Sequence, residues 1–246
     1  MDLQLKDKII IVSGGGRGIG GGIVKALTDE GAIPVIIDRD PPEGEHFKAE
    51  LTDPAECENA IKGAIAKYGR IDGLVNNAGV NDGVGLENGS YEQFIASLHK
   101  NLVHYYLLAK FALPELKKSK GAIVNISSKV AETGQGNTSA YAAANGGRNA
   151  LTREWAVELL PYGIRVNAVI VAECWTPLYE SWIKTVPNPE EKLKSIVSKI
   201  PLGQRMTQAE EIANMVTFLL SEKSSHTTGQ LIHVDGGYTH LDRAIS

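Results

Sequence analysis

The stretch Lys8–Gly20, KIIIVSGGGRGIG, decides the fold of this chain. Four apolar residues, Ile9–Val12, do not alternate with polar ones and are mostly β-branched, which predicts a short strand buried on both faces. Glycines at positions 14, 18 and 20 follow, and a helical pattern begins at Gly20. A tight glycine turn ahead of a helix N-terminus points several backbone N–H groups at one spot, which suits a pyrophosphate.

The residues that follow complete a βαβ unit. Gly31 ends the helix, Ile33–Ile37 reads as a second buried strand, and Asp38 stands at its end. An acid about 20 residues beyond the glycine turn is typical of dinucleotide sites, where its carboxylate binds the adenosine ribose. Strand, turn, helix, strand and acid in this order predict a dinucleotide-binding unit. The alternative is a glycine turn that only reverses the chain.

The composition fits one large α/β domain. The chain has 246 residues, of which 43% are hydrophobic and 22% charged, and its formal net charge is −4. The basic residues are scattered, which argues against a nucleic-acid surface. No apolar run approaches the ~20 residues that span a bilayer, and no signal-peptide core is present, so we expect a cytoplasmic protein without membrane association. Cys57 and Cys174 lie far apart, and no metal-binding pattern occurs, so neither a disulfide nor a metal site is predicted.

Strands and helices alternate along the rest of the chain. After a surface loop at 41–48, strands are expected at 49–51, 71–76, 121–126, 165–171 and 231–234. Helices are expected at 54–68, 91–118, 139–160 and from about 207, where Glu210 would complete a capping box. The first of them should have its N-cap within Thr52-Asp53-Pro54 and end at Gly69. This predicts a single-domain, Rossmann-like, doubly wound parallel sheet with helices on both faces over residues 1–246. Two helical patches at about 174–203 are expected to form a substrate lid. Pro114 is expected to kink the long helix near its end.

Polar residues gather at the carboxyl edge of this sheet, which is where ligands bind in such folds. Asn101 lies on the apolar face of the long helix, Ser128 follows a strand, and Tyr141 opens the next helix. The small residues of Asn77–Gly79 follow another strand and allow close approach of a ligand. Each polar residue also has a structural interpretation: a packed ring for Tyr141, a strand-end cap for Ser128 and a backbone-bonded amide for Asn101.

These motifs together resemble the short-chain dehydrogenase/reductase family over essentially the whole chain. The matching motifs are SGGGRGIG at 13–20, NNAG at 76–79, and Asn101, Ser128 and Tyr141. The resemblance implies that Tyr141 is the general acid/base, which exchanges a proton with the substrate hydroxyl while hydride passes to or from a nicotinamide. It also implies that Ser128 binds the substrate oxygen, and that Asn101 holds a helix kink and a water of a proton relay.

One position departs from the family pattern. The family has a lysine four residues after the tyrosine, where this chain has Asn145. That lysine binds the nicotinamide ribose and stabilises the tyrosinate by its charge, whereas Asn145 can bond the ribose but carries no charge. Three interpretations stay open: a slower but active site, another cation such as Arg148 or Lys129 in the same role, or a chain that binds dinucleotide without turnover. We favour a surviving oxidoreductase, and on this basis Asn145→Lys should raise turnover near neutral pH.

The resemblance also implies a set of cofactor contacts. Asp38 is expected to accept from both ribose hydroxyls of NAD and to repel the 2′-phosphate of NADP, although Arg17 or Arg39 could pair with that phosphate. We therefore expect NAD rather than NADP. The expected cofactor-binding residues are Ser13, Gly14, Arg17, Gly18, Ile19, Gly20, Asp38, Arg39, Glu50, Leu51, Asn77, Ala78, Gly79, Tyr141, Asn145 and Thr176.

Four segments resemble most closely the sugar-oxidising L-fucose dehydrogenase branch of that family. They are SSKVAETGQGNTSAY (127–141), TPLYESWI (176–183), IPLGQRM (200–206) and HTTGQLIHVDGGYTHLDRA (226–244). The resemblance implies oxidation of L-fucose or a related aldose to its lactone, by a homotetramer paired through the two long helices. The expected substrate contacts are Asn81, Ser128, Gln135, Tyr141, Glu173 and Trp175, with Trp175 stacking on the sugar. The alternatives are a hydroxysteroid or keto-acid dehydrogenase and a dinucleotide-binding protein with a silent site.

Overall fold

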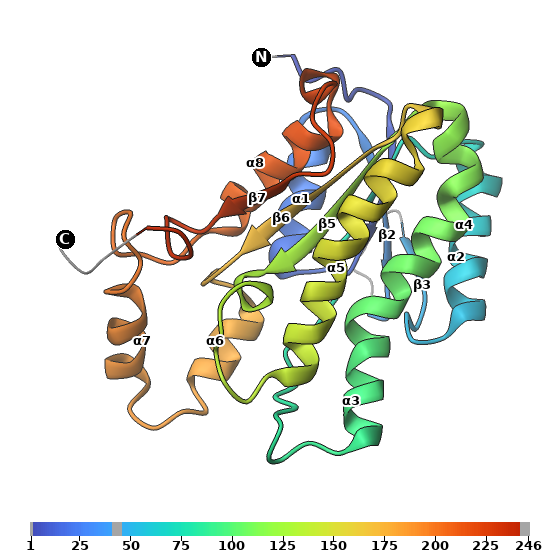
Figure 1. Ribbon diagram of the computed structural model, residues 1–246. Coiled ribbons are helices and arrows are strands. Elements are labelled where there is room, and N and C mark those ends of the chain that lie inside the picture. Colours follow the sequence, from blue (N-terminus) through green and yellow to red (C-terminus); the bar gives the residue numbers. More distant parts are fainter. Residues whose placement is uncertain (1, 41–45, 242–246) are drawn as a thin grey trace.

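The computed structural model describes residues 2–40 and 46–241. Among these residues, seven strands form one parallel sheet in the order β3-β2-β1-β4-β5-β6-β7 (Figure 1). The strands are β1 (Ile9–Ser13), β2 (Ile33–Asp38), β3 (His46–Lys48), β4 (Gly73–Asn76), β5 (Ala122–Ser128), β6 (Arg165–Val171) and β7 (Leu231–Val234). The strand order reverses direction between β1 and β4, as the predicted doubly wound fold requires.

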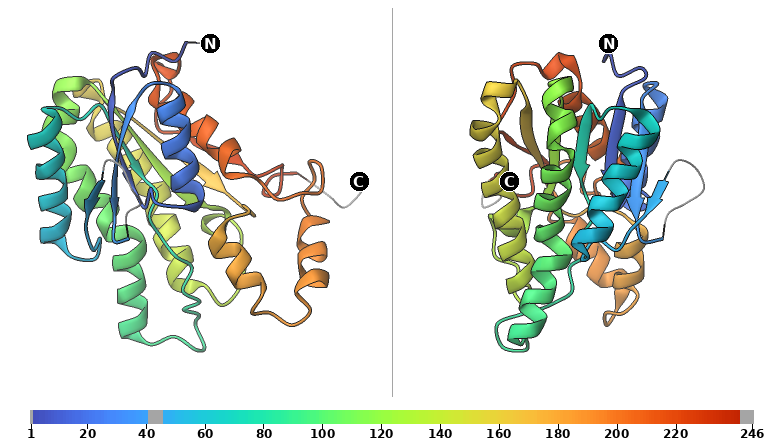
Figure 2. Two further views of the ribbon diagram at one scale, coloured as in Figure 1. Left: turned by 180° about the vertical axis from the view of Figure 1, so that it is seen from behind. Right: turned by 90° about the vertical axis from the view of Figure 1, so that its right-hand side faces the viewer.

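Helices cover both faces of the sheet (Figure 2). Helices α1 and α8 pack together on one face, and α2, α4 and α5 cover the other, while α6 and α7 project beyond the carboxyl edge. The helices are α1 (Gly18–Asp29), α2 (Pro54–Tyr68), α3 (Tyr91–Leu98), α4 (His104–Ser119), α5 (Ser139–Glu158), α6 (Pro177–Ile183), α7 (Pro189–Val197) and α8 (Ala209–Leu220). Within the described residues, no helix has both the length and the apolar character that crossing a membrane requires.

The first strand is apolar throughout because each of its faces meets a different core. Ile9 and Ile11 pack into the cluster beneath α2, α4 and α5, whereas Ile10 and Val12 pack into the cluster beneath α1 and α8. Side chains alternate between the two faces of a strand, so a strand with helices on both sides is apolar at every position. The prediction of a strand buried on both faces, made from this unbroken apolar run, is therefore confirmed.

The edge strand lies earlier in the chain than the sequence predicted. A short strand was expected at 49–51, but β3 is formed by His46–Lys48, which pair with the end of β2. Ala49 then closes the ladder by donating its N–H to the carbonyl of Asp38 at 3.0 Å, and the chain turns away. Pairing with β2, rather than local propensity, sets these bounds. Of the loop expected at 41–48, residues 41–45 lie outside the described residues.

The long helix expected at 91–118 is interrupted, and not by its proline. Pro114 lies within α4 without ending it, whereas His99–Val103 form a π-helical turn between α3 and α4. Asn101 sits in that turn, so the kink that the family resemblance assigned to this residue is present as a π-helical segment. Such insertions occur often at functional sites, because the widened turn re-aims backbone and side-chain groups.

Helix ends follow the predicted capping chemistry with one shift. The carboxylate of Asp53 caps α2 by accepting from Ala55 and Glu56, and Gly69 ends this helix in a left-handed conformation, as expected. In α8, however, Gln208 and Glu211 form the capping box, one residue later than the sequence predicted. Where a capping residue is present, the predicted end of a helix thus agrees with the observed end to within about one residue.

Both cysteines should be chemically silent in the folded protein. Cys57 and Cys174 are buried and free. Burial, reinforced by neighbouring carboxylates, raises the pKa of the Cys57 thiol to about 11 and that of Cys174 to about 12. Because the thiolate is the reactive form, we expect a chromogenic disulfide reagent at pH ~8 to modify neither cysteine in the native protein and both after denaturation. Fast reaction of the native protein would contradict this packing.

Candidate active site

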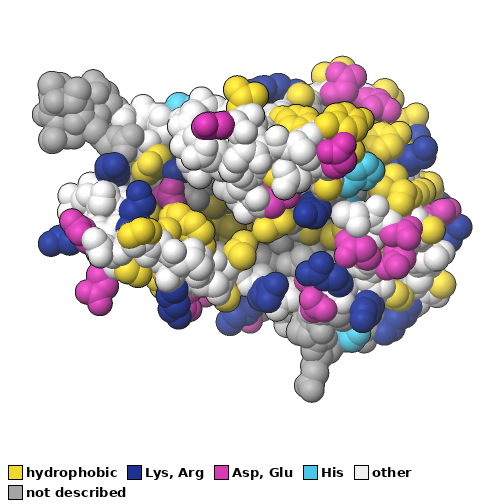
Figure 3. All heavy atoms as spheres, turned by 90° about the horizontal axis from the view of Figure 1, so that it is seen from below, with side chains coloured by type: hydrophobic (Ala, Val, Ile, Leu, Met, Phe, Trp, Pro, Cys, Tyr) yellow, Lys and Arg dark blue, Asp and Glu magenta, His cyan; other side chains and the backbone are white. Residues whose placement is uncertain are grey.

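A cavity of about 640 Å³ lies at the carboxyl edge of the sheet, beside the lid helix α6. Seen from that side, the surface is hollowed, with apolar side chains along the hollow (Figure 3). Every residue predicted for the site lines this cavity except six, which are Ser13, Asn101, Gln135, Asn145, Glu173 and Trp175. The glycine turn and Asp38 thus share one cavity with Ser128 and Tyr141, although Gly14 and Tyr141 are 127 positions apart in sequence (141 − 14).

Ser13 does not line the cavity, and its side chain instead bonds the NNAG segment. Its hydroxyl oxygen accepts the backbone N–H groups of Asn77 at 2.9 Å and Ala78 at 3.2 Å. The side-chain amide of Asn77 in turn donates to the carbonyls of Ser13 and Gly14, at 3.0 and 3.1 Å. These bonds join the ends of β1 and β4 where the strand order reverses, and they fix the glycine turn against the NNAG segment.

Backbone conformation and close contacts favour glycine at three positions of the turn. Gly14 and Gly18 have φ angles of 65° and 57°, in the left-handed region that favours glycine. A Cβ atom at Gly20 would lie 2.1 Å from the carbonyl oxygen of Gly14. No side chain caps the first turn of α1, where Arg17 occupies the N-cap position, so its backbone N–H groups remain available to an anion. This local chemistry fits the pyrophosphate of a dinucleotide.

Carboxylates gather beside the glycine turn. Asp38 accepts from the backbone N–H of Gly16 at 3.2 Å and of Asp40 at 3.1 Å, which fixes its carboxylate at the cavity wall. The guanidinium of Arg39 lies 3.4 Å from the Asp40 carboxylate and 3.6 Å from that of Glu50. Arg39 is therefore already engaged by acids, and a ligand entering here meets a local excess of negative charge.

Tyr141 and Ser128 lie together at the reactive end. Tyr141 stands in the first turn of α5 and Ser128 ends β5, and both line the cavity. The Ser128 hydroxyl also accepts the N–H of Val130, but at 3.4 Å this contact is long. The strand-end cap is thus only weakly made, and the hydroxyl retains hydrogen-bonding capacity toward the cavity.

Asn101 acts behind the cavity wall. Its side-chain oxygen accepts the N–H of Val80 at 2.7 Å, and its amide nitrogen donates to the carbonyl of Ser97 at 3.0 Å. This fully buried amide ties the loop after β4 to the π-helical turn, and both of its polar ends are satisfied.

Asn145, at the position that departs from the family pattern, forms its hydrogen bonds within its own helix. Asn145 donates its amide to the carbonyl of Tyr141 at 2.8 Å and accepts from the guanidinium of Arg148 at 3.0 Å. Because both ends of the amide are used within α5, the ribose contact expected for Asn145 stays a prediction. Sequence reasoning considered Arg148 as a replacement cation without placing its head group; that group lies at the cavity wall, with its central carbon 6.0 Å from the centre of the Tyr141 ring.

Lys129, the other candidate cation, is paired with a carboxylate outside the cavity. Its ammonium forms a buried ion pair with Glu173, 4.1 Å from the centre of the Tyr238 ring. Glu173 also lies beside Tyr179, whose pKa is raised by burial and by this negative charge. Glu173 was expected to bind a sugar hydroxyl, but it neutralises Lys129 and does not line the cavity.

Two other expected substrate residues lie apart from the cavity. Gln135 is exposed in the loop before α5, and the ring of Trp175 lies 6.1 Å from that of Tyr179 at the start of the lid. Their contacts with substrate stay predictions. The cavity wall includes instead Val80, which the sequence did not indicate, and Leu178 and Tyr179 of the expected lid.

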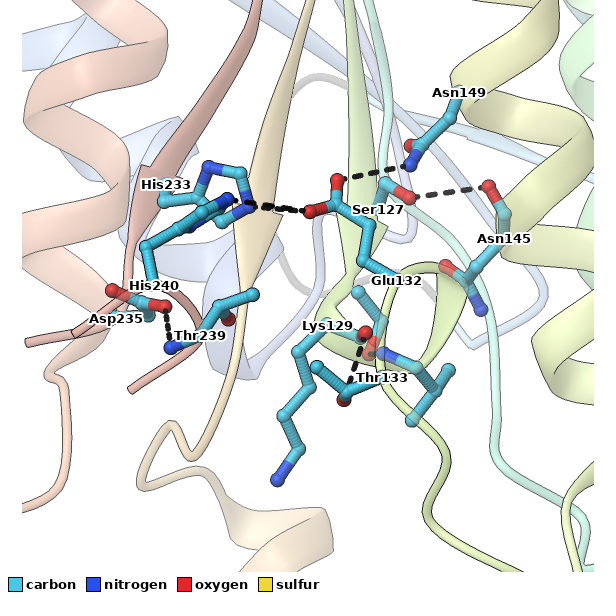
Figure 4. Close-up of polar contacts among 12 residues, drawn as sticks. Ser127, Lys129, Glu132, Thr133, Asn145, Asn149, His233, Asp235, Thr239 and His240 are labelled. Carbon is cyan, nitrogen blue, oxygen red and sulfur yellow. Dashed lines mark hydrogen bonds and ion pairs between the residues drawn. The ribbon is translucent and has the colours of Figure 1, made fainter. Parts of the chain in front are cut away.

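A separate polar cluster ties the end of the chain to the loop after β5 (Figure 4). One carboxylate oxygen of Glu132 lies 3.0 Å from His233 and 3.8 Å from His240, and its other oxygen accepts from Asn149 at 3.5 Å. Two imidazoles and a carboxylate are donor types that zinc uses, and their atoms lie within 4.8 Å of one another. The histidines are dispersed in sequence, so sequence reasoning could not have found this cluster.

Comparisons with known proteins agree with this geometry. A family model described as enoyl-(acyl carrier protein) reductase matches residues 14–239. The L-fucose dehydrogenase of Bos taurus is 37% identical over 248 residues, covering 96% of this chain and 91% of that protein. The crystal structure of Cj0485 dehydrogenase is 46% identical with a TM-score of 0.97, over 100% of this chain and 99% of that one. A ligand-free aldohexose dehydrogenase of Thermoplasma acidophilum is 31% identical with a TM-score of 0.93, over 100% and 99%.

A side chain added within the glycine turn should weaken binding of the dinucleotide. Gly20→Ala forces a methyl group against the Gly14 carbonyl, so we expect the affinity for NAD to fall by about tenfold or more. Gly21→Ala is the matched control, because its nearest new contact is at 3.9 Å. Isothermal titration calorimetry measures both affinities, with melting curves as the check on folding. Equal affinities in the two variants would contradict a ligand seated on this turn.

Proposed function

The chain belongs to the short-chain dehydrogenase/reductase family of nicotinamide-dependent oxidoreductases that act on CH–OH groups, and from this premise we propose that it uses NAD to oxidise L-fucose or a related aldose to its lactone. One observation carries the proposal: a continuous cavity joins Asp38 and the glycine turn to Ser128 and Tyr141. Such a cavity suits a dinucleotide and a small polar substrate side by side.

The reaction removes a hydride from the carbon that bears the hydroxyl and a proton from the hydroxyl itself. When bound, the oxidised nicotinamide supplies the hydride acceptor. Tyr141, as phenolate, accepts the proton of the substrate hydroxyl, and the Ser128 hydroxyl donates a hydrogen bond to the same oxygen. Loss of the C–H hydride and the O–H proton at the anomeric carbon of a pyranose leaves the ring lactone, so the step balances without water.

The choice of a sugar has two supports. The relatives include an L-fucose dehydrogenase and an aldohexose dehydrogenase, each similar over nearly the whole chain. The cavity also presents Asn81 and Lys100 beside Ser128, which are side chains able to bond ring hydroxyls. The apolar lid residues Leu178 and Tyr179 favour the second candidate, a bulkier cyclic alcohol such as a steroid.

The choice of NAD rests on the acids around the adenosine end. Asp38 faces the cavity, which Arg17 and Arg39 also line, and Arg39 is shared by Asp40 and Glu50. A 2′-phosphate would lie against this negative charge, whereas two ribose hydroxyls would donate to it.

We also propose that the chain forms a homotetramer through α4 and α5. Apolar side chains stand exposed on and just beyond these helices, among them Tyr106, Val157 and Leu160. Exposed apolar surface of this kind commonly marks an association face.

A substrate panel tests the proposed activity. With NAD and the purified protein, we expect oxidation of L-fucose and L-galactose, which share a ring and differ at C6, and little oxidation of the mirror-image D-fucose. Tyr141→Phe should lower turnover at least about 100-fold, because the general base is lost. NADH absorbance follows the reaction. Tyr141-dependent oxidation of a steroid alcohol but no sugar would support the second candidate, and no turnover with any substrate would support a silent site.

Removing the ribose carboxylate should change the cofactor preference. For Asp38→Ala, we expect the ratio of kcat/KM with NAD to that with NADP to fall at least about tenfold, because attraction for the hydroxyls and repulsion of the phosphate disappear together. Asp29→Ala changes the net charge equally but lies at the end of α1, and it should leave the ratio within about twofold. An unchanged ratio in Asp38→Ala would refute this role.

A further inference from the structure

Arg148 is a buried cation whose partners are all neutral. It is only 2% exposed, on the inner side of α5. Its guanidinium donates to the carbonyl of Asn101 at 2.6 Å, to that of Ile126 at 3.1 Å and to the side-chain oxygen of Asn145 at 3.0 Å. No described carboxylate lies within ion-pair distance of it, and its Nη2 has no hydrogen-bond partner there. A buried charge without a counter-ion is costly, and an anion that forms nearby during a reaction would offset part of this cost.

Three titratable groups face this guanidinium, and two of them are held neutral. Tyr105 on α4 stacks on it at 4.3 Å, but burial raises the pKa of this phenol, whose hydroxyl donates to the Ile126 carbonyl. Burial and the positive charge of Arg148 lower the pKa of His104 to about 3, so this imidazole adds no second cation. The third group, Tyr141, is the one that also lines the cavity, with its ring centre 6.0 Å from the guanidinium carbon.

The other charges around the site are already paired. Lys100 on the π-helical turn lies 3.6 Å from Asp82, and Lys129 after β5 is paired with Glu173. Neither ammonium leaves an unbalanced charge near the phenol. Arg148 is therefore the source of net positive charge on the Tyr141 side of the cavity among the described residues.

We propose that Arg148 is the positioning residue that stabilises the phenolate of Tyr141 and so enables this tyrosine to act as a base near neutral pH. The inference rests on the proposed function, in which Tyr141 takes the proton of the substrate hydroxyl. It explains how a chain with Asn145 in place of the family's lysine supplies the charge: the cation stands one helical turn further along α5, and Asn145 is the neutral acceptor that holds it.

The identity of this cation has a chemical consequence. A guanidinium stays protonated at every pH at which the protein is folded, so Arg148 provides a constant field and cannot relay a proton. Its Nε–H is fixed by the Asn101 carbonyl, which belongs to the π-helical turn. The turn therefore contributes a backbone acceptor for the cation, and the proton taken up by Tyr141 leaves by a route that does not include Arg148.

A cation at position 148 alters the expected effect of a lysine at position 145. The sequence alone predicts that Asn145→Lys raises turnover, because it assumes that the site lacks a cation. With Arg148 in place, that substitution removes one of the two acceptors of Nη1 and sets a second positive charge beside the first. We now expect Asn145→Lys alone to give no gain, and the double variant Asn145→Lys/Arg148→Gln to recover what Arg148→Gln loses.

Tyrosine ionisation is the direct test, because it needs no cofactor. In protein labelled with ¹³Cζ-tyrosine, the NMR signal of Tyr141 is assigned by its absence in Tyr141→Phe and followed through a pH titration. We expect Arg148→Gln to move the ionisation midpoint of this signal, and the basic limb of the kcat/KM profile, upward by about one pH unit or more. Arg148→Lys, which keeps a charge, should stay within about half a unit of the native protein. Arg153→Gln, an exposed arginine of the same helix, should shift neither.

The outcomes separate this inference from the proposed function. If Arg148→Gln folds with native NAD affinity and slower turnover but neither midpoint moves, Arg148 is only structural and the inference is overturned. If Arg148→Gln fails to fold, Arg148→Met is the second neutral variant, since an apolar chain of similar length fills buried space at little cost. A Tyr141→Phe variant that keeps full turnover would overturn the proposed function, while a shifted NMR midpoint in Arg148→Gln would still establish the electrostatic link.

Discussion

The hydrogen bonds between the ends of β1 and β4 are the constraint on which the site depends. Ser13 and Asn77 exchange backbone and side-chain bonds across the point where the strand order reverses. A parallel sheet leaves a crevice there, because the chain departs toward opposite faces on the two sides. These bonds set the depth of the crevice and hold the glycine turn with α1 aimed into it. Asp38 and Tyr141 acquire a shared cavity only because this junction is fixed.

Charge is distributed unevenly along that cavity, and the unevenness has a structural origin. At the Asp38 end, the carboxylates of Asp40 and Glu50 pair with Arg39, whereas at the Tyr141 end a guanidinium is surrounded by carbonyl and amide oxygens. Neutral dipoles can hold a buried cation without cancelling its field, which a carboxylate would do. The pairing of Lys129 with Glu173 illustrates the contrast, since the two charges there neutralise each other away from the cavity.

The sequence predicted the elements whose chemistry is local and missed those decided by distant partners. The strand Ile9–Ser13, the Asp53 cap and the glycine turn are written in neighbouring residues, and they were found. The edge strand was misplaced because pairing with β2 defines it. The kink at Asn101 was expected only from the family resemblance, because a π-helical turn has no local signature. The ion pair of Glu173 with Lys129 was not predicted, because the two residues lie 44 positions apart in sequence. Of the site, the residue types were predictable, but the directions of their head groups were not.

The Arg148 head group shows why direction matters more than identity here. An arginine one turn after Asn145 is visible in the sequence, and in an exposed helix it would extend into solvent, because a long charged side chain is best hydrated. It turns inward because the π-helical turn offers a backbone carbonyl, β5 offers another, and Asn145 offers a side-chain oxygen. A lysine at 145 would present no acceptor to this guanidinium. Asn145 and Arg148 are therefore best regarded as one unit, in which loss of a charge at one position of α5 allows a charge at the other to be held.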